Sequence, residues 1–545
     1  MGRISSYILA VAVFMCLTAA VAFAEERQSP AIRGFEKVEG YRAFDPLRDR
    51  YFGDFRLSTS FHGRLSGNTS ENLVDLTDKL NDGTTYIGYQ YTINASLRHI
   101  SSAELFLSLI RDNISNYDAP AWKDSRLQTL FGDRHTYTGT EILPRVYKLY
   151  TDLPITDFLD TRLRVGIFPY QVGNGYALGG KYPDLGVNIS FGPEYLRGRV
   201  HYHRVDWYNK QTWGPEIHDD DEDAFHGRHT NADQFAADLM AKIGRHTIQP
   251  YISFFHDYTR PKFRNNIFDN FNLNGTRFNN DLLGTVGIDV NLNFERFNFG
   301  VEYARNFGTG YSSDKTAPDR GDIEHKGWLV VADTGYNLGL VRPKGKFVWA
   351  SGNKASREDT ENFITTTRTN RTFSVYTPTN ANTFDANYQR AGIGPYLATA
   401  STWLFNYGID RPGIFNDPYV MENVIFLNGG LEFFPLNKLY VSLDYWNMHA
   451  DNANYGVSST GAVIKLPSEL GHEIDLFASY GIAKHLSVNL QGGYFIPGKY
   501  YHQKRGETGV FVGRGNLGFS PVLPQDGKGD PDPAFLIALG FEIDF

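Results

Sequence analysis

The last thirteen residues of the chain, PAFLIALGFEIDF (533–545), alternate between two kinds of side chain. Every second position is apolar (Phe535, Ile537, Leu539, Phe541, Ile543 and Phe545), and most of the others are small or acidic. A period of two predicts a β-strand, because successive side chains of an extended backbone point to opposite faces. A strand with these two faces separates an apolar medium from a wetter one.

The first 24 residues have the features of a secretory signal peptide. Arg3 precedes an apolar run over residues 8–20, and Ala22-Phe23-Ala24 matches an A-x-A cleavage site. The single cysteine, Cys16, lies inside this segment. The exported chain of 545 − 24 = 521 residues would therefore contain no thiol, which excludes disulfides and thiolate metal sites.

The composition argues against nucleic acid as a partner. Without Arg3, 52 basic residues face 61 acidic ones, a net charge of −9. Beyond the signal, no apolar run approaches the ~20 residues of a membrane-spanning helix. Aromatic residues at 15% and 54 glycines favour a transmembrane β-barrel, in which alternation hides the lipid-facing side chains.

Eighteen segments repeat the alternating pattern or a weaker form of it. They are 51–65, 84–98, 103–111, 143–151, 161–168, 187–192, 196–207, 233–243, 247–257, 282–294, 297–306, 327–337, 346–352, 424–434, 439–449, 472–480, 485–495 and 535–545. Every second connection between them has nine residues or fewer, and the others have at least eighteen.

This alternation of connection lengths is typical of outer-membrane barrels, which have short periplasmic turns, long outer loops and an even number of strands. We therefore predict an all-β, antiparallel up-and-down barrel of 16–18 strands over residues 51–545, after a periplasmic arm at 25–50. Strand edges cannot face lipid, so the last strand must pair with the first, and Phe545 would face lipid. Both termini would lie in the periplasm of a Gram-negative bacterium. The rival interpretation is a secreted β-sandwich or propeller.

Parity within the strands also predicts which charged side chains line the lumen. The early strands contribute Arg56, Arg64, Arg98, Arg162 and Arg164, and the later ones contribute Asp289, Glu302, Glu432, Asp444, Glu473 and Asp475. We expect a mainly basic wall facing a mainly acidic one, with a transverse field that selects polar solutes. Alternatively, these charges pair with one another and brace the barrel.

Several motifs resemble binding sites but lack a feature that such a site requires. GNGYALGG (173–180) resembles a phosphate loop, but no helix follows it, so we expect an ordinary barrel loop. The acidic loop 218–229 could hold a divalent ion or be solvated, and His201 and His203 share a face but lack a third ligand. The long loop 353–423 either narrows the mouth or lies at the surface. No catalytic motif appears, so we expect neither an enzyme nor a cofactor.

Three stretches resemble the alginate-export porin family of bacterial outer membranes. They are RLRVGIFPYQVGNGYALGG (162–180), FVWASGN (347–353) and GHEIDLFASYGIAKHLSVNLQGGYFIPGKYY (471–501). The resemblance implies an eighteen-stranded barrel whose arginine-lined constriction passes a polyuronate outward. It also implies that Arg162 and Arg164 contribute to that lining.

The sequence thus predicts a porin-like channel for passive diffusion or export of polar or charged solutes. A first alternative is an export porin for an acidic, alginate-like exopolysaccharide. A second is a barrel sheath around a partner protein such as a cytochrome. The expected partners are outer-membrane lipid and lipopolysaccharide, the barrel-assembly machinery, and a polar solute or polysaccharide.

Overall fold

The computed structural model describes fourteen stretches of the chain. They are residues 49–71, 84–115, 145–205, 232–257, 278–312, 322–352, 369–370, 424–436, 438–452, 455–457, 463–465, 467–499, 510–511 and 533–545. In this part of the chain no helix is long and apolar enough to cross a bilayer, a result that does not bear on spanning strands. The signal peptide and most of the predicted arm lie outside the described residues, as do the acidic loop 218–229 and nearly all of 353–423.

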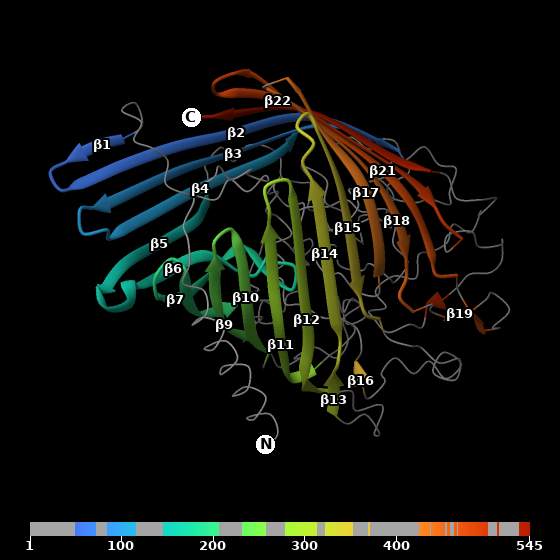
Figure 1. Ribbon diagram of the computed structural model, residues 1–545, viewed down its shortest axis with the longest axis horizontal. Helices are drawn as coiled ribbons and strands as arrows, with labels where there is room; N and C mark the ends of the chain where they lie inside the picture. Colours follow the sequence, from blue (N-terminus) through green and yellow to red (C-terminus); the bar gives the residue numbers. More distant parts are fainter. Residues whose placement is uncertain are drawn as a thin grey trace, which may run out of the picture.

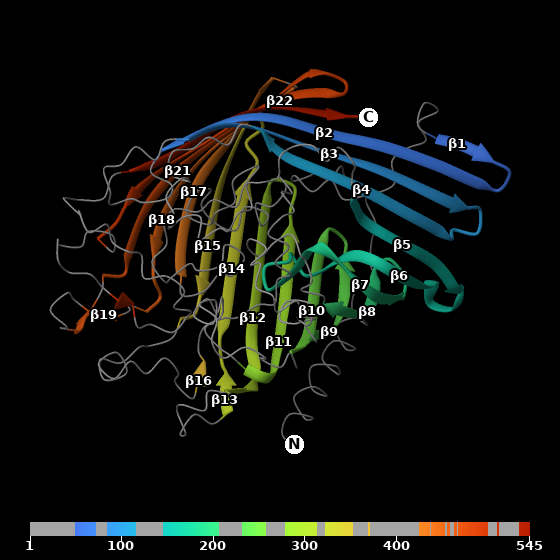
Figure 2. The ribbon, with the colours of Figure 1, turned by 180° about the vertical axis from the view of Figure 1, so that it is seen from behind.

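Eighteen strands form one antiparallel sheet that closes on itself (Figures 1 and 2). In chain order they are β2 (Phe55–Glu71), β3 (Thr84–His99), β4 (Glu104–Ser115), β5 (Arg145–Thr156), β6 (Thr161–Val172), β7 (Leu178–Phe191), β8 (Leu196–Val205), β9 (Ala232–Ile243), β10 (His246–Asp257), β11 (Phe278–Asn293), β12 (Phe297–Ser312), β14 (Trp328–Tyr336), β15 (Val341–Ala350), β17 (Val424–Leu436), β18 (Leu439–His449), β21 (Glu469–Ala483), β22 (Leu486–Pro497) and β24 (Ala534–Asp544). Each pairs with the next in this series, and β24 pairs with β2. The predicted barrel and its upper strand number are confirmed.

The remaining described elements are short. β1 (Asp49–Phe52) folds back on the start of β2, and the 3-10 turn η3 (Phe158–Asp160) joins β5 to β6. β13 (Asp322–His325) extends the β12 edge and pairs with β16 (Thr369–Asn370). β19 (Tyr455–Val457), β20 (Val463–Lys465) and β23 (Val510–Phe511) form a separate three-stranded sheet.

The closing seam joins the two ends of the barrel. His62 on β2 lies opposite Asp544 on β24, and the register continues to Glu71 opposite Phe535. Beyond the last paired strand residue, Phe61 and Phe545 exchange two backbone hydrogen bonds of 2.9 and 2.8 Å. In Figure 1 the red β24 accordingly runs next to the blue β2.

The two faces of the sheet follow the predicted alternation. On β24, Ile537, Leu539 and Phe541 are exposed, whereas Leu536 and Ala538 on the other face are buried. The exposed apolar set continues round the outside through residues such as Val286 and Leu443. Phe545 belongs to this outer set, with 53% of its surface exposed, as predicted.

Three strand boundaries differ from the prediction. The first strand was expected at residue 51, but Gly53 and Asp54 form a hairpin turn, and β2 begins at Phe55. β15 begins at Val341, whereas the prediction placed its start at residue 346. Pro343 and Gly345, which are uncommon inside strands, obscure the alternating pattern before that residue. The predicted long loop at 169–186 is wrong: β6 and β7 both extend into it and leave only residues 173–177 between them.

Candidate transport pathway

A pair of arginines on β6 shares one carboxylate on β5. Nη2 of Arg162 lies 2.6 Å from Oδ1 of Asp152, and Nη2 of Arg164 lies 3.0 Å from Oδ2. The Arg164 guanidinium also lies over the Tyr150 ring, 4.5 Å from its centroid. Two cations on one anion leave this cluster with a net positive charge. Nε of each arginine donates to the same carboxylate oxygen as its Nη2, at 2.7 Å for Arg162 and 3.1 Å for Arg164, and these contacts and the Tyr150 ring restrain the cluster.

Ion pairs between basic and acidic side chains also occur on β8 and β15. Arg199 pairs with Asp238 of β9 at 3.0 Å. On β15, alternate positions carry Arg342, Lys344 and Lys346, and the first two pair with acids of the neighbouring strands. Arg342 reaches Glu432 at 3.3 Å, and Lys344 reaches Asp444 at 2.8 Å. These alternating basic residues are visible in the sequence. They were not predicted to line the lumen, because the strand was expected to begin at residue 346 and not at Val341.

The cations of these inner-wall pairs are more exposed than their acids. The side chain of Arg164 is 37% exposed and that of Asp152 only 10%, and for Arg199 and Asp238 the fractions are 31% and 0%. The pairs Arg98–Glu104, Arg162–Asp152, Arg342–Glu432, Lys344–Glu432 and Lys344–Asp444 follow the same order. Because a long basic side chain extends over a shorter acidic one, the cation is more exposed to the lumen than the acid.

The turn at residues 173–177 folds inward and contacts β11 and β12. The amide of Ala177 donates a 3.1 Å hydrogen bond to Oε1 of Glu302 on β12. The Tyr251 hydroxyl on β10 donates to the same oxygen at 2.7 Å, and Asn174 Nδ2 donates to Oδ1 of Asp289 at 2.7 Å. Glu302 and Asp289 are both buried under this contact. The turn therefore narrows the lumen and removes two predicted lining acids from its surface.

Glycine is required where this turn approaches the wall. Gly173 has a φ of +60°, a conformation that L side chains rarely adopt. A Cβ there would lie 3.0 Å from Cβ of Asp289 and 3.3 Å from Oε2 of Glu302. The glycines that made this stretch resemble a phosphate loop thus allow backbone amides to reach a carboxylate of the protein itself.

The segment before the turn packs on the inner face of β8 and β9. The Tyr170 hydroxyl donates to Oε1 of Gln234, and its ring stacks on His203 with centroids 3.9 Å apart. His201 contacts Asn188 Nδ2 through Nδ1 at 2.7 Å and lies 3.5 Å from Asp238. Among the described residues no third metal ligand joins these two histidines. Their contacts are those of buried packing residues.

Strand register gives the positions of the other predicted lining residues. Arg56 and Arg98 are opposite each other in register, and Arg98 pairs with Glu104 at 2.8 Å. Asp475 is opposite Asp444, and Glu473 is buried opposite Trp446. Arg64 occupies a β2 position opposite Glu542, and its side chain lies outside the described part.

The expected division into a basic and an acidic wall is wrong for the described residues. Asp152 and Asp238 lie among the early arginines, and the three basic residues of β15 lie between the later acids. Charges therefore pair with neighbours along the wall. The alternation of side chains identifies the inner and outer faces of each strand. It does not show which residues of other strands lie close enough to pair with a given charge.

Part of the inner face is apolar rather than polar. Towards the ends of β14–β24 that connect to the long loops, the inward side chains include Leu329, Val348, Phe426, Met448, Leu470 and Phe495, all buried. The expected water-filled, polar lining does not extend over this half of the wall. The expected polar lining was based on the Asn-, Gly- and Ser-rich faces of other segments, and these apolar positions do not share that composition.

A closed antiparallel barrel with an apolar outer face and an inner wall of paired charges defines an outer-membrane channel. The sequence matches the Alginate export family over residues 225–514. The chain belongs to this family. A search of curated proteins finds no match.

Solved structures with a similar arrangement come from Pseudomonas aeruginosa. OccK11 (OpdR) is 10% identical, with a TM-score of 0.43, covering 92% of this chain and 99% of that one. OccK8 (OprE) is 9% identical, with a TM-score of 0.45 and coverages of 90% and 98%. OccK2 (OpdF) in complex with glucuronate is 8% identical, with a TM-score of 0.46 and coverages of 90% and 98%.

Proposed function

We propose that this barrel is a passive channel for acidic carbohydrate, of the polyuronate class that the family's description indicates. The observation that carries the proposal is the order of exposure in the inner-wall ion pairs: arginine and lysine are presented, and the carboxylates are recessed. A polyanion in the lumen meets guanidinium and ammonium groups before it meets acids. Hydrogen-bonding, cationic walls suit carboxylate and hydroxyl groups.

The acidic residues of the later strands would be expected to repel a polyanion. The contacts that cover these acids weaken this repulsion. Glu302 and Asp289 are covered by the 173–177 turn, and Glu432 and Asp444 lie under Arg342 and Lys344. Charges buried within such contacts are partly neutralised by their donors, so they contribute less to the field in the lumen than exposed carboxylates would.

The orientation in the membrane is part of the proposal. Apart from the 173–177 turn, the short connections between described barrel strands, including residues 244–245 and 294–296, gather at the same end as Phe545. Short turns are periplasmic in outer-membrane barrels. This supports periplasmic termini and an assembly route through the barrel-assembly machinery. The exposed apolar band supports contact with lipid and lipopolysaccharide.

Single-channel recording in planar lipid bilayers tests the function. In a KCl gradient we expect preference for chloride over potassium, and we expect uronate oligomers to block the current more strongly than neutral oligomers of equal length. Replacing Arg162 and Arg164 together with Gln should lower the anion preference about three-fold, which corresponds to roughly 0.7 kcal/mol.

The matched control is Arg204→Gln. Arg204 alternates with the inward His201 and His203 positions on β8 and pairs with Asp233, which is offset by one residue from the inward Gln234. Its removal should leave selectivity unchanged. Cation preference in the wild type, or equal block by neutral and acidic oligomers, would exclude a polyuronate channel and leave a general channel for polar solutes.

A further inference from the structure

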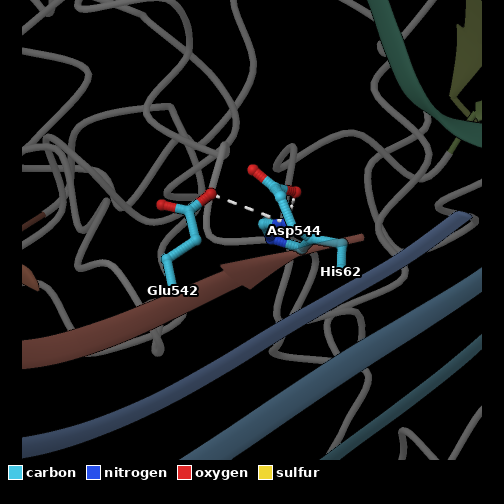
Figure 3. A group of neighbouring side chains, drawn as sticks. All are labelled: His62, Glu542 and Asp544. Carbon is cyan, nitrogen blue, oxygen red and sulfur yellow. Dashed lines mark hydrogen bonds and ion pairs between the residues drawn. The ribbon is translucent and has the colours of Figure 1, made fainter. Parts of the chain in front are cut away.

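Three potential metal ligands meet at the closing seam of the barrel. His62 comes from β2, the first barrel strand, and Glu542 and Asp544 come from β24, the last. Figure 3 shows the three side chains on one side of the paired strands, with the imidazole close to both carboxylates. None of the three belongs to the inner-wall ion pairs described above.

The distances within this cluster are close to those of a metal site. Nδ1 of His62 lies 3.6 Å from Oε1 of Glu542 and 2.8 Å from Oδ1 of Asp544, and the three ligand atoms all lie within 4.8 Å of one another. Tetrahedral ligands at about 2.1 Å from Zn²⁺ are about 3.4 Å apart. The Glu542 contact already has this separation, and the Asp544 contact needs to open by only about 0.6 Å.

The surroundings hold the ligands in position. The two backbone hydrogen bonds between Phe61 and Phe545 fix the strand ends next to the cluster. Asn489 donates to Oε2 of Glu542 at 3.1 Å, which leaves Oε1 directed at the imidazole. Nδ1 of His485 contacts the Asp544 carbonyl at 2.7 Å. Outer contacts of this kind orient ligands and limit the reorganisation that binding requires.

The donor set selects the class of ion. One imidazole nitrogen and two carboxylate oxygens suit Zn²⁺ or another divalent transition metal better than Mg²⁺, which prefers oxygen ligands and retains its water. The two negative charges balance a divalent cation. The side chains are 22–32% exposed, so an ion can reach them and a water can complete the coordination.

We propose that His62, Glu542 and Asp544 bind a divalent transition metal that links the first and last strands of the barrel. Since the ligands come from opposite ends of the chain, only the closed barrel brings them together. Binding to the closed form alone must stabilise it against opening and unfolding. The three side chains lie on the inner face of the seam, and the proposal does not depend on the identity of the transported solute.

Calorimetric titration of the folded, chelator-treated protein in detergent micelles tests the site with Zn²⁺. We expect one ion per chain, no heat from Mg²⁺ at the same concentration, and at least a ten-fold loss of Zn²⁺ affinity in His62→Ala and Glu542→Gln. His99→Ala is the matched control, because the Nδ1 atom of this strand histidine contacts Ser101 rather than a carboxylate. Its affinity should equal that of the wild type.

A second measurement separates a metal link from a hydrogen bond alone. Zn²⁺ should raise the midpoint of thermal unfolding of the wild type and of His99→Ala, but not that of Glu542→Gln or Asp544→Asn. These two substitutions keep the side-chain shape if His62→Ala fails to fold. Absence of stoichiometric binding, or equal affinity in wild type and Glu542→Gln, would show that His62 and Asp544 form only a hydrogen bond.

Discussion

Ala177 and Glu302 are joined by a hydrogen bond across the inside of the barrel, although they lie 125 residues apart in the sequence. The bond runs from a backbone amide of the β6–β7 turn to a carboxylate on β12. It holds inside the barrel a connection that would otherwise lie at the rim. One buried carboxylate therefore helps to hold this turn inside the barrel.

Removing this carboxylate should widen the channel. In Glu302→Ala the amide of Ala177 loses its acceptor, so the turn should be released from the wall and single-channel conductance should rise. Glu302→Gln keeps an acceptor oxygen and should stay near the wild-type conductance. Equal conductance in the wild type and Glu302→Ala would show that the turn does not limit the current.

Neutralising the acid beneath the arginine pair should increase anion preference. Asp152→Asn leaves the charges of Arg162 and Arg164 without their shared counterion, and the chloride-to-potassium permeability ratio should rise about two- to five-fold, or roughly 0.4–1 kcal/mol. The effect is opposite in sign to that of replacing the arginines. Glu469→Gln, whose partner Lys499 lies at the long-loop end of β22, should not change the ratio. A fall in the ratio for Asp152→Asn would contradict the assignment.

Gly166 should be intolerant of any side chain. Its φ is +135°, and a Cβ would collide with the backbone carbonyl oxygen of Leu149 on the paired strand. We expect Gly166→Ala to lower the free energy of unfolding by about 1–3 kcal/mol or more. Gly345→Ala is the control, because its nearest heavy atom would be 3.5 Å away. Urea titration of both variants in micelles measures the difference.

The lipid-facing position Leu539 should reject a charge. It lies in the middle of β24 with about half of its surface exposed. Leu539→Arg should cost about 2–4 kcal/mol of stability in a bilayer, because the guanidinium is transferred from water into hydrocarbon. Leu539→Ala should cost much less. Folding titrations into lipid vesicles measure both, and equal losses would place this strand face away from lipid.

The terminal aromatic should contribute to assembly. Phe545 shares two backbone hydrogen bonds with Phe61, and its ring stacks on His485 with centroids 5.3 Å apart. We expect Phe545→Ser to reduce the amount of closed barrel in the outer membrane, and Phe545→Tyr to retain it. Electrophoresis of unheated membrane fractions measures the closed form. Normal amounts of the serine variant would mean that the ring is dispensable.

Sequence alone determined the approximate number of strands, their order and their two faces. These features follow from a period of two in side-chain polarity and from alternating connection lengths, and both are local properties of the chain. Even the weak segments 187–192 and 346–352 proved to be parts of β7 and β15.

Only the tertiary structure decided which residues meet. Arg164 with Asp152, the 173–177 turn with Glu302, and His62 with Asp544 are contacts set by strand register and by closure of the sheet. Each joins segments whose separation in sequence, 482 residues for the last pair, gives no local signal. The sign of the electric field in the lumen likewise depends on whether the cation or the acid of each ion pair is more exposed. Side-chain length and packing in the closed barrel determine this exposure.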